Sequence, residues 1–136
     1  MAREKPWTKG LYESIAAVDL IYRQKLDEKN RICLIILDST LEISFKEFLV
    51  NDDKVPRLSE AKLKGLFNNR VDVHKEIKKY VKVNSNLWPI IEHYYILRCK
   101  LIHERATAGI TDEQIEDFRK VVQKVLKKLF GLKFSK

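Results

Sequence analysis

An arginine and a histidine in the second half of this chain are the residues whose types and spacing could carry out chemistry. Arg98 and His103 stand in the string Arg-Cys-Lys-Leu-Ile-His. A guanidinium stays charged at working pH and can hold a phosphate or a carboxylate through two hydrogen bonds. An imidazole ionises near neutral pH, so it can take up or release a proton. Together the two side chains could bind an anion and move a proton beside it.

The stretch that carries this pair, residues 87–104, has the pattern of one helix. Pro89 suits a first helical turn, where its missing N–H is not needed. Apolar side chains then recur at helical spacing: Ile90, Ile91, Tyr94, Leu97 and Leu101. Arg98 falls beside this stripe, and a guanidinium next to a core rarely stays without a partner. We therefore expect a carboxylate near Arg98.

Two carboxylates on an earlier segment are candidates for that partner. Asp38, Glu42 and Lys46 lie four residues apart along residues 31–50, an otherwise apolar stretch. One interpretation is an exposed charged line with a Glu42–Lys46 pair. The other places Asp38 or Glu42 beside Arg98 as its orienting carboxylate. The sequence favours the exposed line by a small margin.

The remaining patterns predict an all-α bundle of about five or six helices, in a single domain (1–136) with its core at about 11–130. Hydrophobic residues make up 45% of the 136 residues, with only four glycines and three prolines, which argues against disorder and against a β-sandwich. Helical periodicity predicts further helices over residues 11–26, 31–50, 59–67, 71–81 and 111–129. The helix over 31–50 is apolar on more than one face, so we expect it to be central or at a subunit interface. Thr111 and Gln114 form a capping-box pattern, and Gly131 marks a helix end.

Charge and cysteine content limit the classes of function. The formal charge of +8 favours a polyanionic partner such as RNA, but weakly. The lysines of residues 62–82, Arg70 and His74 are expected on a solvated surface, with a phosphate-tracking patch as the less favoured alternative. The lysines late in residues 111–129 suit the helix dipole and need no ligand. Cys33 and Cys99 predict reduced thiols, and with no membrane-spanning run and no leader we expect a cytoplasmic protein.

The Arg-x4-His string resembles the motif of the HEPN superfamily (higher eukaryotes and prokaryotes nucleotide-binding). In that family the motif lies near the end of a core helix. The order of predicted helices is also similar: two long helices, a shorter middle pair, the motif helix, a brief loop and a capped amphipathic helix. The resemblance covers about residues 11–129. One position departs from it, because the residue after the arginine is commonly a small polar one, often Asn, and here it is Cys99.

The resemblance implies a metal-independent endoribonuclease, with His103 as general acid or base and Arg98 holding the phosphate. It also implies RNA as the partner, no cofactor and no metal, and a homodimer whose motifs meet in a shared cleft. Arg98 and His103 are about 140° apart on an ideal helix, so their convergence needs either a loosened helix end or a second copy of the chain. The resemblance implies the second. Cys99 and Glu104 flank the site as supporting residues. Family toxins and abortive-infection factors are often paired with an antitoxin or act in a larger defence complex.

Two other functions stay open at this point. The first is a non-catalytic HEPN-like module that binds RNA, a nucleotide or a protein, which Cys99 favours because a thiol is a weak hydrogen-bond donor. The second is a helical dimerisation domain without a ligand. In either case Arg98 would brace the bundle through a carboxylate, and His103 would satisfy the end of its helix.

Overall fold

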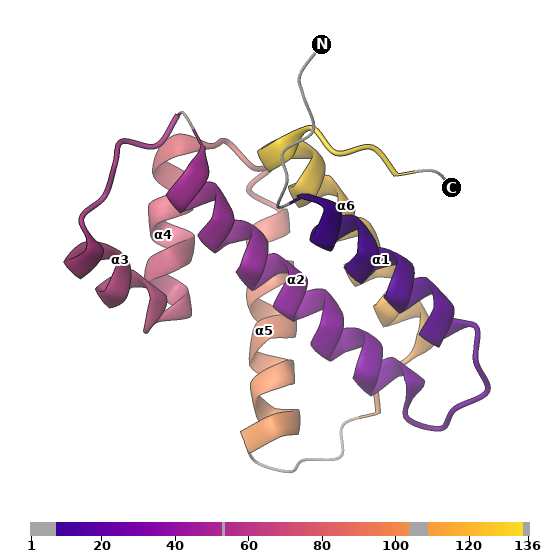
Figure 1. The fold of residues 1–136 in the computed structure, drawn as a ribbon. Helices are drawn as coiled ribbons and strands as arrows, with labels where there is room; N and C mark the ends of the chain where they lie inside the picture. The colour runs from indigo at the N-terminus through magenta and orange to yellow at the C-terminus, as the bar shows by residue number, and fades with distance from the viewer. Residues whose placement is uncertain (1–7, 53, 104–108, 135–136) are drawn as a thin grey trace.

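The computed structural model describes residues 8–52, 54–103 and 109–134, without the side chains of residues 102 and 103. Over these residues the chain forms six helices and no strands (Figure 1). They are α1 (Thr8–Tyr22), α2 (Lys29–Asn51), α3 (Glu60–Phe67), α4 (Arg70–Tyr80), α5 (Leu87–His103) and α6 (Asp112–Phe130). The predicted all-α bundle is confirmed, with the upper of the two expected helix numbers. None of the helices in this part of the chain is both long and apolar enough to span a membrane.

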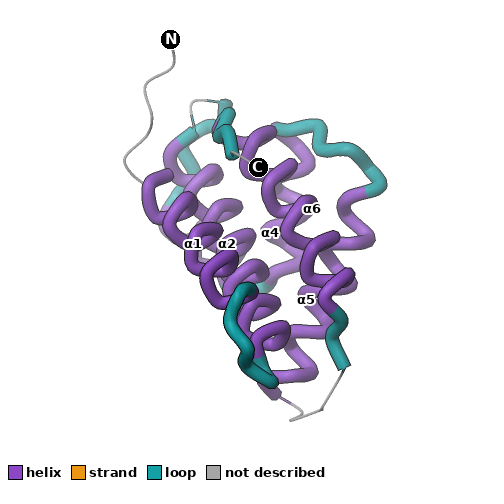
Figure 2. The backbone as a smooth tube through the Cα atoms, turned by 90° about the vertical axis from the view of Figure 1, so that its right-hand side faces the viewer, coloured by secondary structure: helices purple, strands orange, loops and turns teal. Residues whose placement is uncertain are grey.

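The helix α2 is the centre of the bundle. It packs against α1, α4, α5 and α6, and it lies side by side with the antiparallel α1 in both views of the backbone (Figures 1 and 2). Its fully buried apolar residues lie within about a third of its circumference, and Ile43 on the other side is 50% exposed. The buried ones are Cys33, Leu34, Leu37, Leu41, Phe45 and Phe48. The contacts with four other helices confirm the prediction of a central helix.

The helix α5 is held in place from both sides. Ile91 and Tyr94 are buried, and the Tyr94 ring stacks on Phe118 of α6 with ring centroids 4.4 Å apart. One turn further along α5, the chain reaches Arg98, which faces α2 rather than α6. The short α3 contributes no buried residue and packs on α4. The core thus sets the orientation of α5, and with it the direction in which Arg98 points.

Most helix ends follow the sequence signals, and one does not. Thr111 and Gln114 form the predicted capping box, and Gly131 ends α6 in the left-handed region with φ of 69°. The first helix ends at Tyr22, whereas the pattern predicted an end near residue 26. The side chain of Gln24 donates to the carbonyl oxygen of Leu20 and so satisfies a terminal carbonyl of the helix. Leu26 lies in the following loop and is half exposed.

We predict that Thr111→Ala lowers the free energy of unfolding by about 1 kcal/mol, because the Gln114 N–H loses its side-chain acceptor. Urea unfolding followed by circular dichroism measures this change. Ser85→Ala, at an exposed serine in the loop before α5, is the control and should change stability by less than about 0.5 kcal/mol. Equal effects of the two substitutions would show that the cap does not stabilise α6.

Candidate functional site

The carboxylate of Asp38, on the central helix α2, is fully buried and is held by a guanidinium from α4. Arg70 donates from Nη2 to Oδ1 at 2.8 Å and from Nη1 to Oδ2 at 3.2 Å. Both side chains are out of contact with solvent, at 0% exposure for Asp38 and 2% for Arg70. A buried charge needs a partner with good geometry, and the two-bond fork of an arginine on a carboxylate supplies it.

A second guanidinium reaches the same carboxylate from α5. The Nε atom of Arg98 lies 2.6 Å from Oδ2 of Asp38, although its N–H is not aligned with that oxygen and makes no hydrogen bond. The contact is therefore an ion pair rather than a directed hydrogen bond. The Tyr95 ring lies next to both cations, with its centroid 4.5 Å from Cζ of Arg70 and 5.7 Å from Cζ of Arg98. Asp38 thus links α2 with both α4 and α5.

A buried histidine occupies the remaining edge of Arg70. The Nε of Arg70 donates to Nε2 of His74 at 2.8 Å. Burial of the ring, and then the positive charges of Arg70 and Lys78, lower the pKa of His74 to about 3. The ring is neutral at pH 7, and since Nε2 accepts a bond its proton lies on Nδ1. That nitrogen has no hydrogen-bond partner, and the nearest carboxylate oxygen, of Glu92, is 4.0 Å away.

Only one of the two carboxylates that the sequence suggested as a partner of Arg98 lies beside it. Asp38 lies beside Arg98, so the interpretation as an exposed charged line is wrong for Asp38. Glu42 is 37% exposed and pairs with Lys46 at 3.6 Å, which confirms that part of the interpretation. Its Oε1 also accepts from Nη1 of Arg70 at 3.5 Å, and in the described part of the chain Arg98 pairs with Asp38 and not with Glu42. The reason is position, because Asp38 faces the packed interior of the bundle and Glu42, one turn later, lies at its edge.

Two members of this cluster were wrongly expected on the surface. Counted over the whole residue, backbone included, Arg70 and His74 are 6% and 1% exposed. Both lie on the apolar face of α4, since positions 70, 73, 74 and 77 recur at helical spacing and include the buried Val73 and Ile77. This spacing can be read from the sequence and indicates burial. The residue types indicated exposure instead, because an arginine or a histidine is buried only when it has a partner, and here that partner lies on another helix.

The other predicted site residues are described only in part. Cys99 is half buried, and burial together with a hydrogen bond to the Cys99 side chain raises the pKa of Tyr95. His103 is the last residue of α5. Its side chain, and the whole of Glu104, lie outside the described residues.

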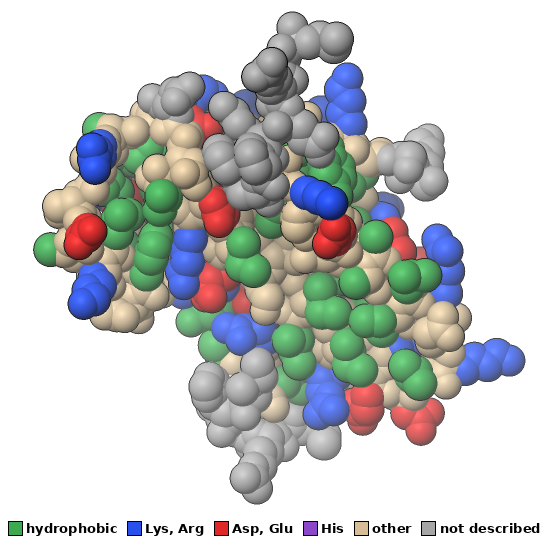
Figure 3. Space-filling view, viewed as in Figure 1, with side chains coloured by type: hydrophobic (Ala, Val, Ile, Leu, Met, Phe, Trp, Pro, Cys, Tyr) green, Lys and Arg blue, Asp and Glu red, His purple; other side chains and the backbone are tan. Residues whose placement is uncertain are grey.

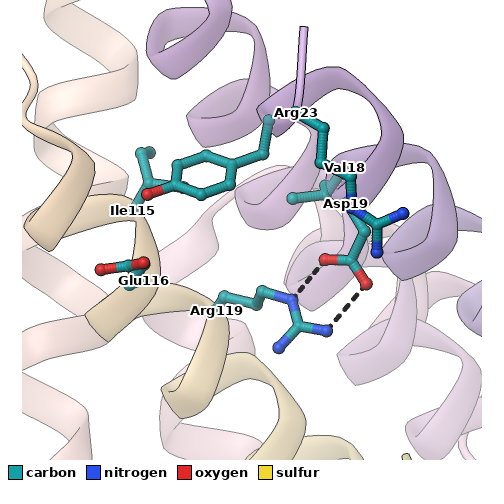
Figure 4. A pocket seen from close by; sticks show the side chains of 7 residues that line it. Val18, Asp19, Arg23, Ile115, Glu116 and Arg119 are labelled. Carbon is teal, nitrogen blue, oxygen red and sulfur yellow. Dashed lines mark hydrogen bonds and ion pairs between the residues drawn. The ribbon is translucent and has the colours of Figure 1, made fainter. Parts of the chain in front are cut away.

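A hollow of about 350 Å³ lies between α1 and α6 (Figure 4), and none of its lining residues belongs to the cluster around Asp38. Its lining residues are Val18, Asp19, Tyr22, Arg23, Ile115, Glu116 and Arg119. The guanidinium of Arg119 donates to both oxygens of Asp19, at 2.6 and 2.8 Å. Burial and then a hydrogen bond to Glu116 raise the pKa of Tyr22 to about 12. Two arginines face two carboxylates here, so the hollow does not select a ligand by net charge.

In comparisons with known proteins, no family model, no curated protein and no solved structure matches the chain. Within the described part of the chain, no three His, Cys, Asp or Glu side chains converge as a metal site would require. The side chains around Asp38, and the residues that follow Arg98 on α5, are therefore the basis for assigning a chemistry to this protein.

We predict that Asp38→Asn lowers the free energy of unfolding by about 3–5 kcal/mol, because two guanidiniums lose the buried charge that compensates them. Chemical denaturation at neutral pH is the measurement. Glu42→Gln serves as the matched control on the same helix, and at its exposed position the loss should stay below about 1 kcal/mol. A small loss for Asp38→Asn would contradict the central role given to this carboxylate.

We also predict that wild-type stability falls with pH below about 6.5 through His74. The unfolded state binds the imidazole proton below pH 6.5 and the folded state binds it only near pH 3, so acid favours unfolding in this interval. At pH 5 the loss from this residue is about 2 kcal/mol. His74→Gln keeps an acceptor for Arg70 and removes the titration.

Urea unfolding at pH 7.5 and pH 5.0 checks this effect. The stability difference between the two pH values should be smaller in His74→Gln than in wild type by about 2 kcal/mol. His93→Gln, at an exposed histidine on α5, is the control and should keep the wild-type difference. The same pH dependence in wild type and His74→Gln would contradict the assignment.

Proposed function

We propose that this chain is a HEPN-type endoribonuclease that cuts RNA without a metal ion and works as a homodimer. The observation that carries the proposal is the way Arg98 is held. Its Nε lies against Asp38, and no described residue accepts a hydrogen bond from its Nη1 or Nη2. The side chain keeps 18% exposure. An arginine anchored by one edge can offer the other edge to a phosphate with little loss of side-chain freedom on binding.

The chemistry that follows from such an arrangement is transesterification within RNA. The ribose 2′-oxygen attacks the neighbouring phosphorus while a base removes the 2′-proton. The bond from phosphorus to the 5′-oxygen breaks, and an acid gives that oxygen a proton. Arg98 would hold the non-bridging oxygens as charge develops on them. His103 would move the proton, since the ordinary pKa of a histidine suits both steps. The products are a 2′,3′-cyclic phosphate and a 5′-hydroxyl.

A pair of chains could bring an arginine and a histidine to the same phosphate, which a single α5 helix does not do. Residues 98 and 103 are about 140° apart around α5, so a single helix does not direct both side chains at one phosphate. A symmetric dimer would bring two copies of each residue to a shared cleft, one histidine acting as base and the other as acid.

Exposed apolar side chains on α1 and α2 support this dimer. Leu20 and Ile43 are 60% and 50% exposed, and hydrophobic side chains gather over the first half of α2 and the adjoining end of α1 (Figure 3). On α5, Ile96 is 54% exposed and lies two residues before Arg98. Exposed apolar patches of this kind are typical of association surfaces.

A non-catalytic HEPN-like module that binds RNA, a nucleotide or a protein is the second candidate. One observation favours it: Arg98 already has a structural partner in Asp38, so its presence can be explained without a substrate. A toxin with a cognate antitoxin belongs to the first candidate, and an interaction module in a larger complex belongs to the second.

The test is cleavage of a mixed RNA pool in EDTA by wild type and by His103→Ala. We predict cyclic-phosphate ends from wild type and a loss of about 10²-fold or more in His103→Ala, the usual size of a general acid–base contribution. His93→Ala removes an exposed histidine from the same helix and should cleave like wild type. Equal activity in His103→Ala and wild type would reject the mechanism. Activity in none of the three proteins would favour the binding module.

A further inference from the structure

Three adjoining hollows run from the end of α4, past the loop before α5, to the second half of α6. Their volumes are about 480, 440 and 410 Å³. Lys82 and Val83 line both the first and the second hollow, and Lys124 lines both the second and the third. The three hollows therefore adjoin one another, with Lys82, Val83 and Lys124 at their shared edges, and we call the three together the depression.

The charged side chains that line this depression are positive with one exception among the lining residues. Seven lysines line it, and we call them the lysine tract: Lys78, Lys82, Lys120, Lys124, Lys127, Lys128 and Lys133. Glu92 is the one carboxylate among the lining residues. Within the described part of the chain, no lysine of the tract lies within ion-pair distance of a carboxylate. The hollow between α1 and α6 differs in this respect, because its two carboxylates offset its two arginines.

The helix dipole explains only part of the tract. Lys127 and Lys128 lie in the last turn of α6, where positive charge is favourable. Lys78 lies in the last turn of α4, where the dipole of that helix favours it as well. Lys82 follows the end of α4, and Lys120 lies near the middle of α6, so neither dipole explains these two lysines. Lysines from separate elements that converge without counter-charges raise the local positive potential, which attracts a polyanion. A ligand is therefore a better explanation of the whole tract than the two helix dipoles.

The shape of the depression fits a phosphodiester chain. Lys120, Lys124 and Lys128 follow each other at a rise of about 6 Å along α6, close to the repeat of phosphates on an extended strand. Each hollow also has an apolar part of its wall, from Trp88, Leu87 and Phe134 in turn. Trp88 is only 6% exposed, and its ring centroid lies 4.9 Å from the Lys78 ammonium. The half-buried Leu87 and Phe134 are therefore the walls that a base could contact. A single strand can place phosphates on the lysines and bases against such walls.

We propose that the lysine tract binds the backbone of single-stranded RNA. This inference rests on the proposed function, in which RNA is the substrate, and adds where a distant part of that RNA would lie. Leu87 lines the tract, and His103 lies at the other end of the 17-residue α5, about 24 Å away. The tract would then hold several nucleotides beyond the phosphate that is cut and would favour long substrates over short ones.

The experiment measures binding of a fluorescent 12-nucleotide RNA that carries 2′-O-methyl groups throughout, so that it cannot be cleaved. Lys82→Glu/Lys124→Glu reverses charge at both junctions between hollows. Lys25→Glu/Lys54→Glu, at exposed loop lysines outside the tract, makes the same change in net charge. We expect the first variant to weaken binding about tenfold or more at 0.1 M salt and to reduce the slope of log K against log salt by about 1.4. The control should lose less than about threefold.

Three results would overturn the inference: no binding by wild type at 50 mM salt, equal losses in the two double variants, or stronger binding to phosphatidylserine vesicles than to RNA. Cleavage of unmodified RNA by the same proteins separates the two proposals. Tract-dependent binding without cleavage would reject the ribonuclease and keep the tract. Cleavage of long RNA that is unchanged in Lys82→Glu/Lys124→Glu would keep the ribonuclease and reject the tract.

Discussion

The buried carboxylate of Asp38 is the interaction on which the arrangement of α2, α4 and α5 depends. Removing a carboxylate from water carries a large desolvation penalty, and one cation at good geometry often only balances it. Here Arg70 forks onto the carboxylate and Arg98 adds a second positive charge at 2.6 Å. Each arginine comes from a different helix, so the two contacts fix both helices relative to α2. An apolar contact could hold these helices together, but it would specify their relative positions less sharply.

The same carboxylate explains how Arg98 can be structural and still be available to a ligand. Arg70 uses its two Nη groups on Asp38, and its Nε on His74. Arg98 uses Nε alone. The two guanidiniums therefore share one anion but differ in what they leave free. A side chain that is already held in place loses less entropy when it binds a phosphate, which offsets part of the repulsion between that phosphate and the Asp38 carboxylate. The structural and the catalytic interpretations of Arg98 are thus compatible.

Sequence reasoning succeeded where structure is local. The capping box of Thr111 and the end of α6 at Gly131 are set by residues within one turn of each other. It failed where a partner lies on another helix. His74 and Arg70 occupy the apolar face of α4 at helical spacing, but the type of each residue suggested solvent, and their burial depends on Asp38, 32 residues before Arg70. From the sequence, Asp38 and Glu42 were both candidates for the partner of Arg98. They are one helical turn apart, and only the packing of the other helices decides which of the two carboxylates faces inward.

The formal charge of +8 indicates a polyanionic partner only weakly, because it does not distinguish the cations that are paired with carboxylates from those that are not. Arg70, Arg98 and Arg119 all lie against carboxylates, two of them in the interior and one in the hollow between α1 and α6. The positive charge that is left over gathers on lysines, and those of the tract meet no carboxylate among the described residues. Unpaired like charges repel one another and destabilise a compact chain, so a polyanion bound to them would relieve that repulsion as well as gain contacts. Paired arginines build this fold, and unpaired lysines are where a polyanionic partner would be attracted.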